Sequence, residues 1–464
     1  MRDSRPWAAL LAAALVLSAG ALAWPFTIDD AYIVARYAQN LAHGHGYAFN
    51  PGVTSDGVTG PLWLLPMGLG QWAGVSSVAL AKGVDLVCGA LAAALATRAG
   101  SGKAWLVALV IGTNAAFLPW TVGGLGIGVA ALLLLLAAPE GASSRRSLVA
   151  GAMVGLLAWL RPEACVAGFV LLLGLESRMR GRALAVAIAG VALVVVFRLV
   201  LFGHAWPMAL AAKPSTPWAG MDYVARGVFV CFGGFGLGLA AWALRAAGRG
   251  RVYAAAVLAQ LVAIALAGGD WMPGYRLFAP IVPLYALASV EGLTSLQRTR
   301  PRGALGLGVV ALALPLLFAG LELPELRASG HARESVAGPL AAELGALAGP
   351  IALVDVGYLG YRSGAPIVDL GGVTDPVIAG SAGGYLAKHI DPAYLARRDP
   401  AALVLHAAIA PEVDADGNLS QLLGYPVERR VAAMPFVRLR YRVERVVPYT
   451  PGYVYVLLVR RANP

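Results

Sequence analysis

The feature that most constrains the fold is a series of long apolar segments recurring from Trp7 to Gly320. Several of them approach the ~20 residues that a helix needs to cross the hydrocarbon core of a bilayer. The chain of 464 residues is 59% hydrophobic and only 13% charged, whereas a soluble domain carries about 25% charged residues. The sequence therefore predicts a polytopic α-helical membrane protein.

The basic residues lie in short clusters between the apolar segments, and these clusters occupy every second loop. Lys and Arg are enriched in cytoplasmic loops, so the pattern indicates topology and puts the N-terminus in the cytoplasm. The net charge of +11 therefore does not indicate a nucleic-acid partner. The clusters are Arg2/Arg5, Arg98/Lys103, Arg145/Arg146, Arg178/Arg180/Arg182, Arg245/Arg249/Arg251 and Arg298/Arg300/Arg302.

With these inside markers, the apolar segments predict about eleven membrane helices in a multi-pass protein of the cytoplasmic (inner) membrane. The first segment has one alternative, a cleavable signal peptide, because Ala21-Leu-Ala23 fits a cleavage site. We expect it to remain a helix, because the chain continues as a polytopic protein. Residues 61–74 are short and interrupted by glycine, which indicates an interfacial or re-entrant helix. The expected spans are 7–24, 76–97, 104–120, 124–138, 148–160, 164–176, 183–202, 223–244, 252–267, 279–295 and 304–320.

The composition changes after Gly320. Residues 321–464 carry Glu, Arg, Asp and Pro throughout and have no apolar run of membrane length. Three short apolar runs in this part predict buried strands, at 351–355, 401–406 and 453–459. We therefore expect two domains, a transmembrane domain over residues 1–320 and an extracytoplasmic soluble α/β domain over 321–464.

The first outer loop in this topology covers residues 25–60 and begins with the adjacent carboxylates Asp29 and Asp30. The residues after them have helical spacing of apolar side chains and predict a short amphipathic helix. One of the two acids is expected to cap this helix, which leaves the other free. A free carboxylate at this face can orient a sugar hydroxyl, hold a cation or accept a proton. The apolar face of the helix is Ile33, Tyr37 and Leu41.

Two later outer loops combine acids, aromatic residues and isolated cations. Arg161-Pro-Glu163 alone indicates an ion pair that anchors two helix ends. Residues 268–276 contain Asp270, Trp271, Tyr275 and Arg276 between glycines and a proline. A belt of side chains at the membrane interface needs Trp, Tyr and Arg but no acid, so this loop predicts the rim of a cavity.

The remaining polar candidates give weaker predictions. Lys213 can hold a phosphate as a point charge or extend along the membrane interface. His43 and His45 have no third ligand nearby, so a turn role with a hydrogen bond to sugar or backbone is favoured over zinc. The cysteines lie inside apolar segments and predict packing. We expect no metal site and no required cofactor, while a divalent cation on the Asp pair stays open.

From Asp29-Asp30-Ala-Tyr-Ile-Val-Ala-Arg36 to Asn50-Pro51-Gly52, the chain resembles the first outer loop of the C-superfamily of membrane glycosyltransferases. More narrowly, it is similar to the terminal β-arabinofuranosyltransferase family. The chain departs from the family at Gly126, where a glutamate is usual, and at Ser55-Asp56-Gly57. The later motifs that are similar, in the family's order, are Arg161-Pro-Glu163, Gly269-Asp270-Trp-Met-Pro-Gly-Tyr-Arg276, Asp355-Val-Gly-Tyr-Leu-Gly360 and Asp369-Leu-Gly-Gly-Val-Thr-Asp375.

The resemblance implies a multi-span enzyme with its active site at the outer membrane face. Its donor would be a polyprenyl-phosphate-linked sugar, which the narrower resemblance implies to be arabinofuranose, and its acceptor would be a cell-envelope glycan. The catalytic aspartate of the family maps onto Asp29 or Asp30, and we favour Asp29. The cations expected to hold the donor phosphate are Arg276, Lys213 and Arg161. The expected substrate-binding residues are Tyr32, Arg36, His43, His45, Asp56, Glu163, Asp270, Trp271 and Tyr275.

Two other functions compete with this interpretation. One is a related transferase for another lipid-linked sugar such as mannose. The other is a polytopic transporter or flippase, which would be expected to show charged or broken helices at mid-membrane, often in related halves. The notable polar residues instead gather at one face of the predicted bundle, which favours the transferase.

Overall fold

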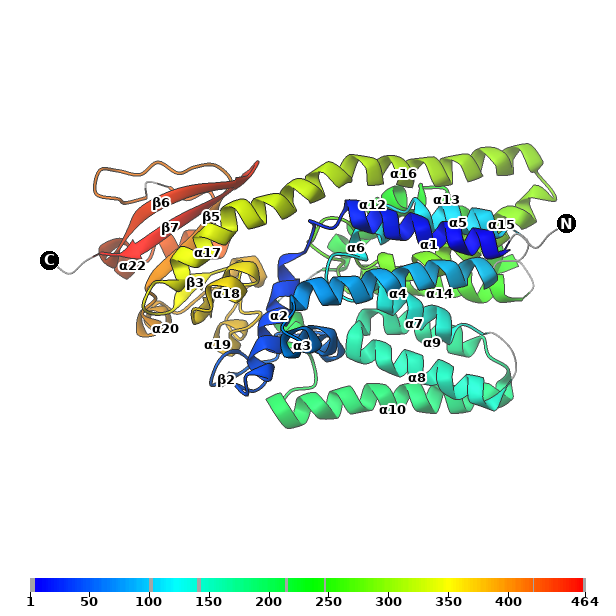
Figure 1. Cartoon of the computed structure of the whole chain (residues 1–464), viewed down its shortest axis with the longest axis horizontal. Helices are drawn as coiled ribbons and strands as arrows, with labels where there is room; N and C mark the ends of the chain where they lie inside the picture. Colours follow the sequence, from blue (N-terminus) through cyan, green and yellow to red (C-terminus); the bar gives the residue numbers. More distant parts are fainter. Residues whose placement is uncertain are drawn as a thin grey trace.

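The computed structural model describes residues 5–99, 103–139, 143–212, 216–245, 248–419 and 421–461. A helical bundle forms one end of an elongated molecule and a unit that contains a β-sheet forms the other (Figure 1). The N-terminus lies at the bundle end far from the sheet, and the C-terminus lies beside the sheet. Residues 29–72 form a layer between the two parts.

In the described ranges, six helical segments are long and apolar enough to cross a membrane. A seventh is counted if α12 (Pro217–Phe232) and α13 (Gly236–Trp242), which meet at a bend of 91°, form one broken span. The prediction of about eleven spans therefore stays a prediction. The six segments are α1 (Arg5–Leu22), α4 (Ser77–Ala99), α10 (Ser177–Phe202), α14 (Arg249–Leu266), η4 with α15 (Ala279–Gln297), and Pro301–Gly345.

The other predicted spans correspond to shorter helices. These helices pack inside the bundle, where protein rather than lipid surrounds part of their length. For example, α7 is apolar along its whole length and has eight buried residues. The shorter helices are α5 (Ala104–Gly112), α6 (Phe117–Trp120), α7 (Ile127–Ala137), α8 (Ser144–Leu160) and η2 with α9 (Pro162–Leu173).

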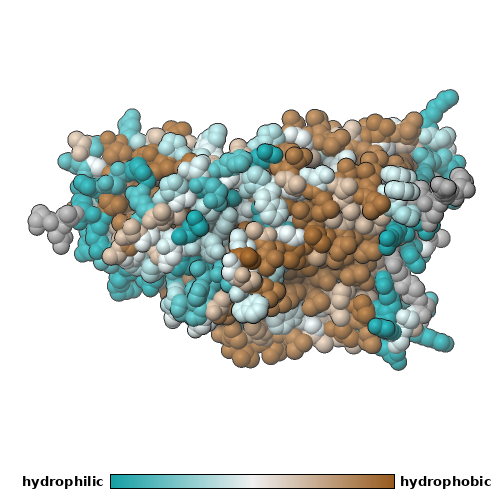
Figure 2. All heavy atoms as spheres, viewed as in Figure 1, coloured by the Kyte–Doolittle hydropathy of each residue, from teal (hydrophilic) through white to brown (hydrophobic). Residues whose placement is uncertain are grey.

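An apolar band covers the face of the bundle seen in Figure 2, with hydrophilic residues beyond it at both ends. The outward side chains of α10 and α14 supply part of this surface, since Val200 is 78% exposed and Leu266 is 69% exposed. Leu305 on α16 is 66% exposed. Exposed apolar surface on this scale is unfavourable in water and stable against lipid tails. The chain is therefore an integral membrane protein.

Helix α16 (Pro301–Ala332) connects the bundle to the sheet-containing unit (Figure 1). Its 32 residues span about 48 Å at the usual helical rise, which exceeds the ~30 Å of a bilayer core. The predicted domain boundary at residue 320 lies inside this helix. A π-helical segment, η5 (Arg333–Ala337), and α17 (Gly338–Gly345) continue it.

The sheet has five strands in the order β4-β3-β5-β7-β6. Strands β4, β3 and β5 are parallel, whereas β7 is antiparallel to both β5 and β6. Strands β3, β5 and β7 lie where the three apolar runs predicted strands. The strands are β3 (Ile351–Leu353), β4 (Ile367–Asp369), β5 (Ala402–Ala407), β6 (Tyr441–Thr450) and β7 (Tyr453–Arg460).

Short helices surround this sheet, and one of them, α18 (Tyr358–Ser363), connects β3 to β4 and packs against the layer that contains residues 29–72. That layer consists of α2 (Asp29–Ala42), β1 (Ala48–Asn50), β2 (Val53–Thr54), η1 (Pro61–Trp63) and α3 (Leu64–Trp72). Ile33 and Tyr37 are buried on α2 as expected, whereas Leu41 is 41% exposed at the end of the helix. The remaining short helices are α11 (Met208–Ala212), η3 (Ala243–Arg245), α19 (Pro376–Ala379), η6 (Tyr385–Ala387), α20 (Pro392–Arg398), α21 (Pro426–Ala432) and α22 (Pro435–Arg440).

Candidate active site

A group of charged side chains lies where α2 meets the ends of the bundle helices, and we call it the charged cluster. Its centre is Arg276, whose Nε donates to Asp270 Oδ2 at 2.5 Å and whose Nη1 lies 3.5 Å from Asp30 Oδ2. Burial alone would lower the pKa of Arg276, but the carboxylates of Asp270 and Asp30 outweigh it and raise the pKa above its usual value. The guanidinium therefore stays charged. The cluster comprises Asp30, Arg161, Glu163, Asp270 and Arg276.

Arg161 and Glu163 supply the second ion pair of the cluster. They flank Pro162 at the turn between α8 and η2, and Arg161 Nη2 lies 2.6 Å from Glu163 Oε1. Burial lowers the pKa of Arg161, and the charges of Arg276 and Asp270 are close enough to act on it. Among the described residues, none accepts a hydrogen bond from the buried Nε of Arg161. The ion pair expected from the sequence is present, and the Nε of Arg161 is buried without a partner.

The two adjacent aspartates point to different partners. Asp29 accepts hydrogen bonds at 2.8 Å from the backbone N–H groups of Gly357 and Tyr358, at the start of α18. Asp30 faces Arg276 instead. The expectation that one of them caps α2 is wrong, because the residue at its N-cap is Ile28 and no side chain bonds there. Asp29 caps α18, a helix more than 300 residues away in the chain.

Burial raises the pKa of Asp29, although the backbone hydrogen bond from Tyr358 and the charge of Arg333 oppose the rise. Gly357 makes this contact possible, because a Cβ there would overlap the main-chain and carboxylate oxygens of Asp29. Tyr32, one turn along α2, packs its ring edge-on against Tyr358 with 4.9 Å between centroids. Asp29 and Tyr32 therefore join α2 to the sheet-containing unit.

Two predicted substrate-binding residues are buried and bonded to other parts of the protein. Arg36 is 4% exposed and donates to the carbonyl oxygens of Phe49, Gly360 and Ala365. Asp56 is 1% exposed and accepts from Arg198 Nε on α10 at 3.0 Å. Burial raises the pKa of Asp56, while Arg198 opposes the rise. These two side chains hold the layer of residues 29–72 against its neighbours.

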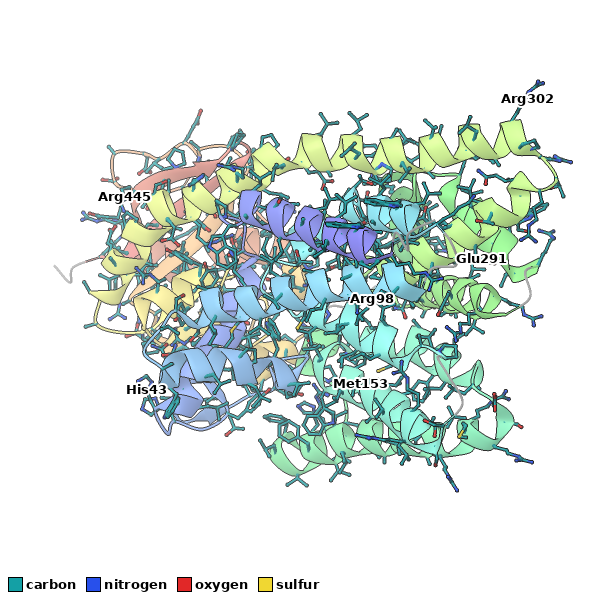
Figure 3. The ribbon with its side chains drawn as sticks, turned by 45° about the vertical axis from the view of Figure 1, so that its right-hand side comes forward. His43, Arg98, Met153, Glu291, Arg302 and Arg445 are labelled. Carbon is teal, nitrogen blue, oxygen red and sulfur yellow. The ribbon has the colours of Figure 1, made fainter. Side chains whose placement is uncertain are left out.

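His43 and His45 do not approach the charged cluster. Both are exposed at the far end of α2, and Figure 3 shows His43 at the outer edge of the layer. His43 Nδ1 lies 2.8 Å from its own helix's Gln39 carbonyl oxygen. The turn role that the sequence favoured agrees with these positions.

The aromatic residues of the loop 268–276 lie at the edge of the cluster. Trp271 is half exposed, and its ring lies 5.8 Å from that of Tyr385 in η6. Tyr275 has a left-handed backbone conformation with φ 52°, and its ring packs against Tyr223 at 5.4 Å. Tyr385 is close enough to interact electrostatically with both Asp30 and Asp29. The sequence did not single it out, because nothing local marks a tyrosine in the C-terminal part as a neighbour of α2. Lys213 lies outside the described residues.

Two charged residues on α4 position the loops around the cluster, and sequence reasoning missed both. Lys82 Nζ donates to the carbonyl oxygens of Trp24 and Phe26 and to Thr27 Oγ1, at 2.5, 2.9 and 2.9 Å. Asp85 accepts from the backbone N–H groups at the start of α7, at 3.0 and 3.1 Å. The sequence does mark them, because two charged residues three positions apart lie inside an apolar segment. An unpaired charge there costs free energy, so such residues usually have partners.

The departure of Gly126 from the family pattern has a steric reason. Gly126 has φ +75° at the start of α7, and a Cβ there would lie 2.9 Å from Leu160 and 3.1 Å from Trp63. Any side chain here would be strained by the left-handed backbone and would press on Leu160 and Trp63, so glycine suits this turn.

The motif residues of the sheet-containing unit shape its loops. Asp369 accepts from the backbone N–H groups of Gly371, Gly372 and Thr374, and Asp375 caps α19. Burial raises the pKa of Asp369 to about 6. Asp355 accepts from the Tyr453 hydroxyl, and burial followed by the charge of Asp29 raises its pKa to about 7.

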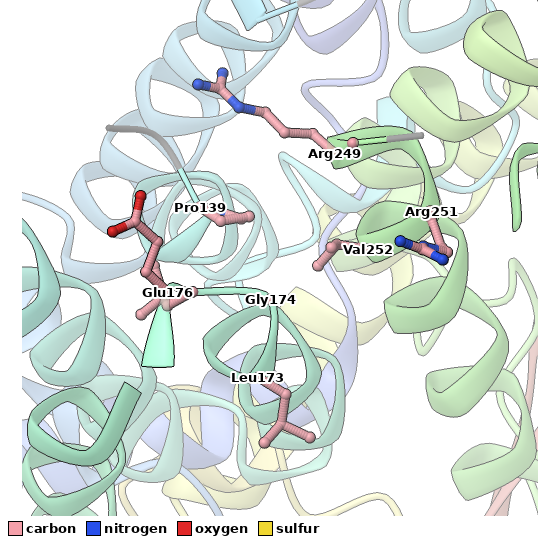
Figure 4. Close-up of a pocket in the computed structure, with 9 residues that line it drawn as sticks. Pro139, Leu173, Gly174, Glu176, Arg249, Arg251 and Val252 are labelled. Atoms are coloured by element: carbon pink, nitrogen blue, oxygen red, sulfur yellow. The ribbon is translucent and has the colours of Figure 1, made fainter. Parts of the chain in front are cut away.

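Among the described residues, no group of three or more His, Cys, Asp or Glu side chains is arranged to hold a metal ion. A pocket of about 620 Å³ lies elsewhere, between the end of α9 and the starts of α10 and α14 (Figure 4). Arg249, Arg251 and Glu176 line it. Helix α14 begins at this pocket and ends before Asp270, so its 18 residues separate the pocket from the charged cluster by ~27 Å.

Three comparisons place these features among known proteins. Residues 327–454 match a family described as Domain of unknown function (DUF8728). No curated protein matches the chain. Among solved structures, ArnT from Cupriavidus metallidurans bound to undecaprenyl phosphate matches over 98% of both chains, with a TM-score of 0.55 and 14% sequence identity. The chain therefore shares the fold of this ArnT structure along nearly its whole length.

Proposed function

We propose that the protein is an integral-membrane glycosyltransferase that moves arabinofuranose from a polyprenyl-phosphate donor to a cell-envelope glycan at the outer membrane face. The charged cluster is the observation that carries the proposal: a guanidinium fixed between two carboxylates, beside a second, partly unsatisfied guanidinium. The fold supports it, because the similar structure of ArnT is bound to undecaprenyl phosphate.

The arrangement of charge along the bundle supports an outward-facing site. Basic residues such as Arg302 lie at the bundle end far from the sheet, and Arg445 lies at the opposite end (Figure 3). Cytoplasmic loops are enriched in Arg and Lys. The charged cluster lies at the end of α14 remote from Arg249, and therefore at the face opposite the basic loops. A donor whose lipid is held in the outer leaflet presents its phosphate at this level.

The donor phosphate would bind Arg276 and the neighbouring guanidinium of Arg161. Arginine suits this role because its planar fork of N–H groups matches phosphate oxygens. Both guanidiniums are already paired with acids, so the phosphate must replace a weaker contact. The contact between Arg276 and Asp30 is the longest of the cluster, at 3.5 Å, and Asp30 is its more exposed partner at 24%. Binding of the donor would thereby release the Asp30 carboxylate from Arg276.

The released Asp30 would act as general base toward the acceptor. The acceptor hydroxyl oxygen forms a bond to the anomeric carbon, and its proton passes to Asp30. The bond from that carbon to the phosphate oxygen breaks, and polyprenyl phosphate leaves with the electron pair. The two guanidiniums stabilise the charge that gathers on the phosphate, which is the larger catalytic effect for a good leaving group. Asp29, held by α18, would position Asp30.

The test is sugar transfer by the full-length protein in nanodiscs, with decaprenyl-phosphoarabinose as donor and arabinan oligosaccharides as acceptors. We expect Asp30→Asn to lower kcat by roughly 100- to 10,000-fold, the usual contribution of a general base. Asp222→Asn is the matched control, since Asp222 is an exposed acid in an ion pair with Arg226. Full activity of Asp30→Asn contradicts the assignment of the base. Transfer from decaprenyl-phosphomannose alone contradicts the assignment of the sugar.

A further inference from the structure

Arg333 occupies an unusual position beyond the membrane end of α16. It is 8% exposed, and its guanidinium carbon Cζ lies 5.7 Å from the ring centroid of Tyr32 and 6.0 Å from that of Tyr358. Tyr449 and Tyr455, from β6 and β7, are close enough to interact with its charge. We call this group the tyrosine site. It joins α2, α18, η5 and the sheet.

The guanidinium of Arg333 makes no hydrogen bond or ion pair within 4.0 Å to any residue that the structure describes. None of its nitrogens is both unpartnered and cut off from solvent, so they keep contact with solvent. The five N–H groups of a buried guanidinium normally donate hydrogen bonds to acceptors. Arg333 instead has aromatic rings near it and open hydrogen-bond donors, which suits a ligand that brings acceptor oxygens.

The backbone at Arg333 is also exceptional. The segment from Arg333 to Ala337 is π-helical, between the α-helices α16 and α17. Such segments insert one residue into a helical turn and occur frequently at functional sites. Here the π-helical segment begins at the arginine that faces Tyr32.

The surrounding charge argues against an anionic ligand. The charge of Asp29 acts on Arg333 directly. Glu334 is exposed beside it and accepts from the Tyr358 hydroxyl at 3.2 Å. Asp355, bonded to Tyr453, is a third acid of this region and interacts electrostatically with Asp29. Three acids around one cation repel a phosphate or carboxylate group. A polyol is compatible with them, because its hydroxyls accept from a guanidinium and donate to carboxylates.

We infer that the tyrosine site binds a neutral sugar ring of the acceptor glycan, an inference that rests on the proposed function. The rings that can face a sugar are those of Tyr361 and Tyr449, half-buried at the edge of the site, because Tyr32, Tyr358 and Tyr455 are buried. Such rings present flat apolar faces to the C–H groups of a sugar, and Arg333 donates to its hydroxyl oxygens. Asp29 belongs to the site and precedes Asp30 in the chain, so a glycan held here adjoins the charged cluster. The sheet-containing unit thereby contributes to acceptor binding.

The experiment measures saccharide binding without donor lipid, by saturation-transfer NMR on the full-length protein in nanodiscs. The probes are a methyl arabinofuranosyl disaccharide and the same disaccharide carrying one phosphate. We expect the neutral probe to bind more tightly. Arg333→Met should weaken its binding about tenfold, the loss expected for hydrogen bonds to a charged group. Arg438→Met, at an exposed arginine of α22, should leave binding unchanged.

Arg333→Lys separates binding from packing, because lysine keeps the charge near the rings but loses the planar fork. We expect this variant to melt like the wild type and to bind the neutral probe several-fold more weakly. Equal binding by Arg333→Lys and the wild type overturns the inference, as does tighter binding of the phosphorylated probe. Separately, Arg276→Gln should lose undecaprenyl phosphate binding while keeping saccharide binding. If Arg276→Gln still binds undecaprenyl phosphate, the proposed function is contradicted. The saccharide-binding measurements then decide the inference about the tyrosine site separately.

Discussion

At the scale of single residues, the two adjacent aspartates have different environments. Asp29 is held by two backbone N–H groups of the sheet-containing unit, and Asp30 faces a guanidinium. The sequence analysis favoured Asp29 as the catalytic acid, although nothing local in the sequence distinguishes it from Asp30. The partners of Asp29 lie 328 and 329 positions away. That separation is why sequence reasoning could identify the pair but could not divide the roles.

Gly357 tests the contact on which the position of Asp29 depends. We expect Gly357→Ala to destabilise the protein by about 1–3 kcal/mol, the usual cost of forcing an atom into a packed site. The added Cβ would overlap the oxygens of Asp29. Differential scanning fluorimetry in detergent measures the change. Gly380→Ala is the control, because its nearest neighbour to an added Cβ is 3.6 Å away. Equal melting of the two variants would contradict the contact.

Asp355 predicts a pH dependence of stability. Its pKa is raised from 3.8 to about 7 in the folded protein. Between these two values the folded protein binds the extra proton, so stability falls as the pH rises through this window. We expect Asp355→Asn, which carries no titrating group, to reduce the fall in melting temperature between pH 5 and pH 8. A fall of the same size in the variant would show that another group is responsible.

At the scale of elements, α4 fixes the loops that frame the site. Lys82 holds the connection from α1 to α2, and Asp85 holds the start of α7. The span itself was predictable from its length and hydropathy. Most partners of Lys82 and Asp85 were not, because they are main-chain oxygens and N–H groups that any sequence carries. The partner of Asp56 was not predictable for another reason, since Arg198 lies 142 positions away inside another apolar run.

Lys82→Met tests this role. We expect a loss of about 2–4 kcal/mol, because three acceptors lose their donor in a buried site. Arg98→Gln, at the exposed last turn of the same helix, should change stability little. Thermal unfolding in nanodiscs compares the two variants. A melting temperature of Lys82→Met equal to that of the wild type would mean that lipid or water replaces the lost donor at no cost.

At the scale of the whole molecule, the membrane orientation is the property that the proposed function needs. Composition and the basic clusters predicted a membrane protein. The strands β3, β5 and β7 followed from short apolar runs. The layer of residues 29–72 was only partly predictable, because its position between bundle and sheet depends on contacts such as those of Arg36 with residues more than 300 positions away.

Cysteine labelling measures the orientation. Arg302 and Arg445 are exposed at opposite ends of the molecule (Figure 3). We expect Arg445→Cys to react with a membrane-impermeant maleimide in intact spheroplasts, and Arg302→Cys to react only after lysis. The native Cys88, Cys165 and Cys231 lie in helices of the bundle and set the background. Labelling of Arg302→Cys in intact cells would invert the topology and contradict a site at the outer face.

The length of α16 makes the protein sensitive to the thickness of its membrane. Its length of ~48 Å exceeds the thickness of the bilayer core, so one part of the helix lies in lipid and the rest extends beyond the membrane. A thinner membrane increases the tilt of such a helix, and a thicker one reduces it. The part of the helix outside the membrane leads to Arg333 and the sheet-containing unit. Lipid composition therefore sets how high the C-terminal unit stands above the level at which the donor's phosphate is held.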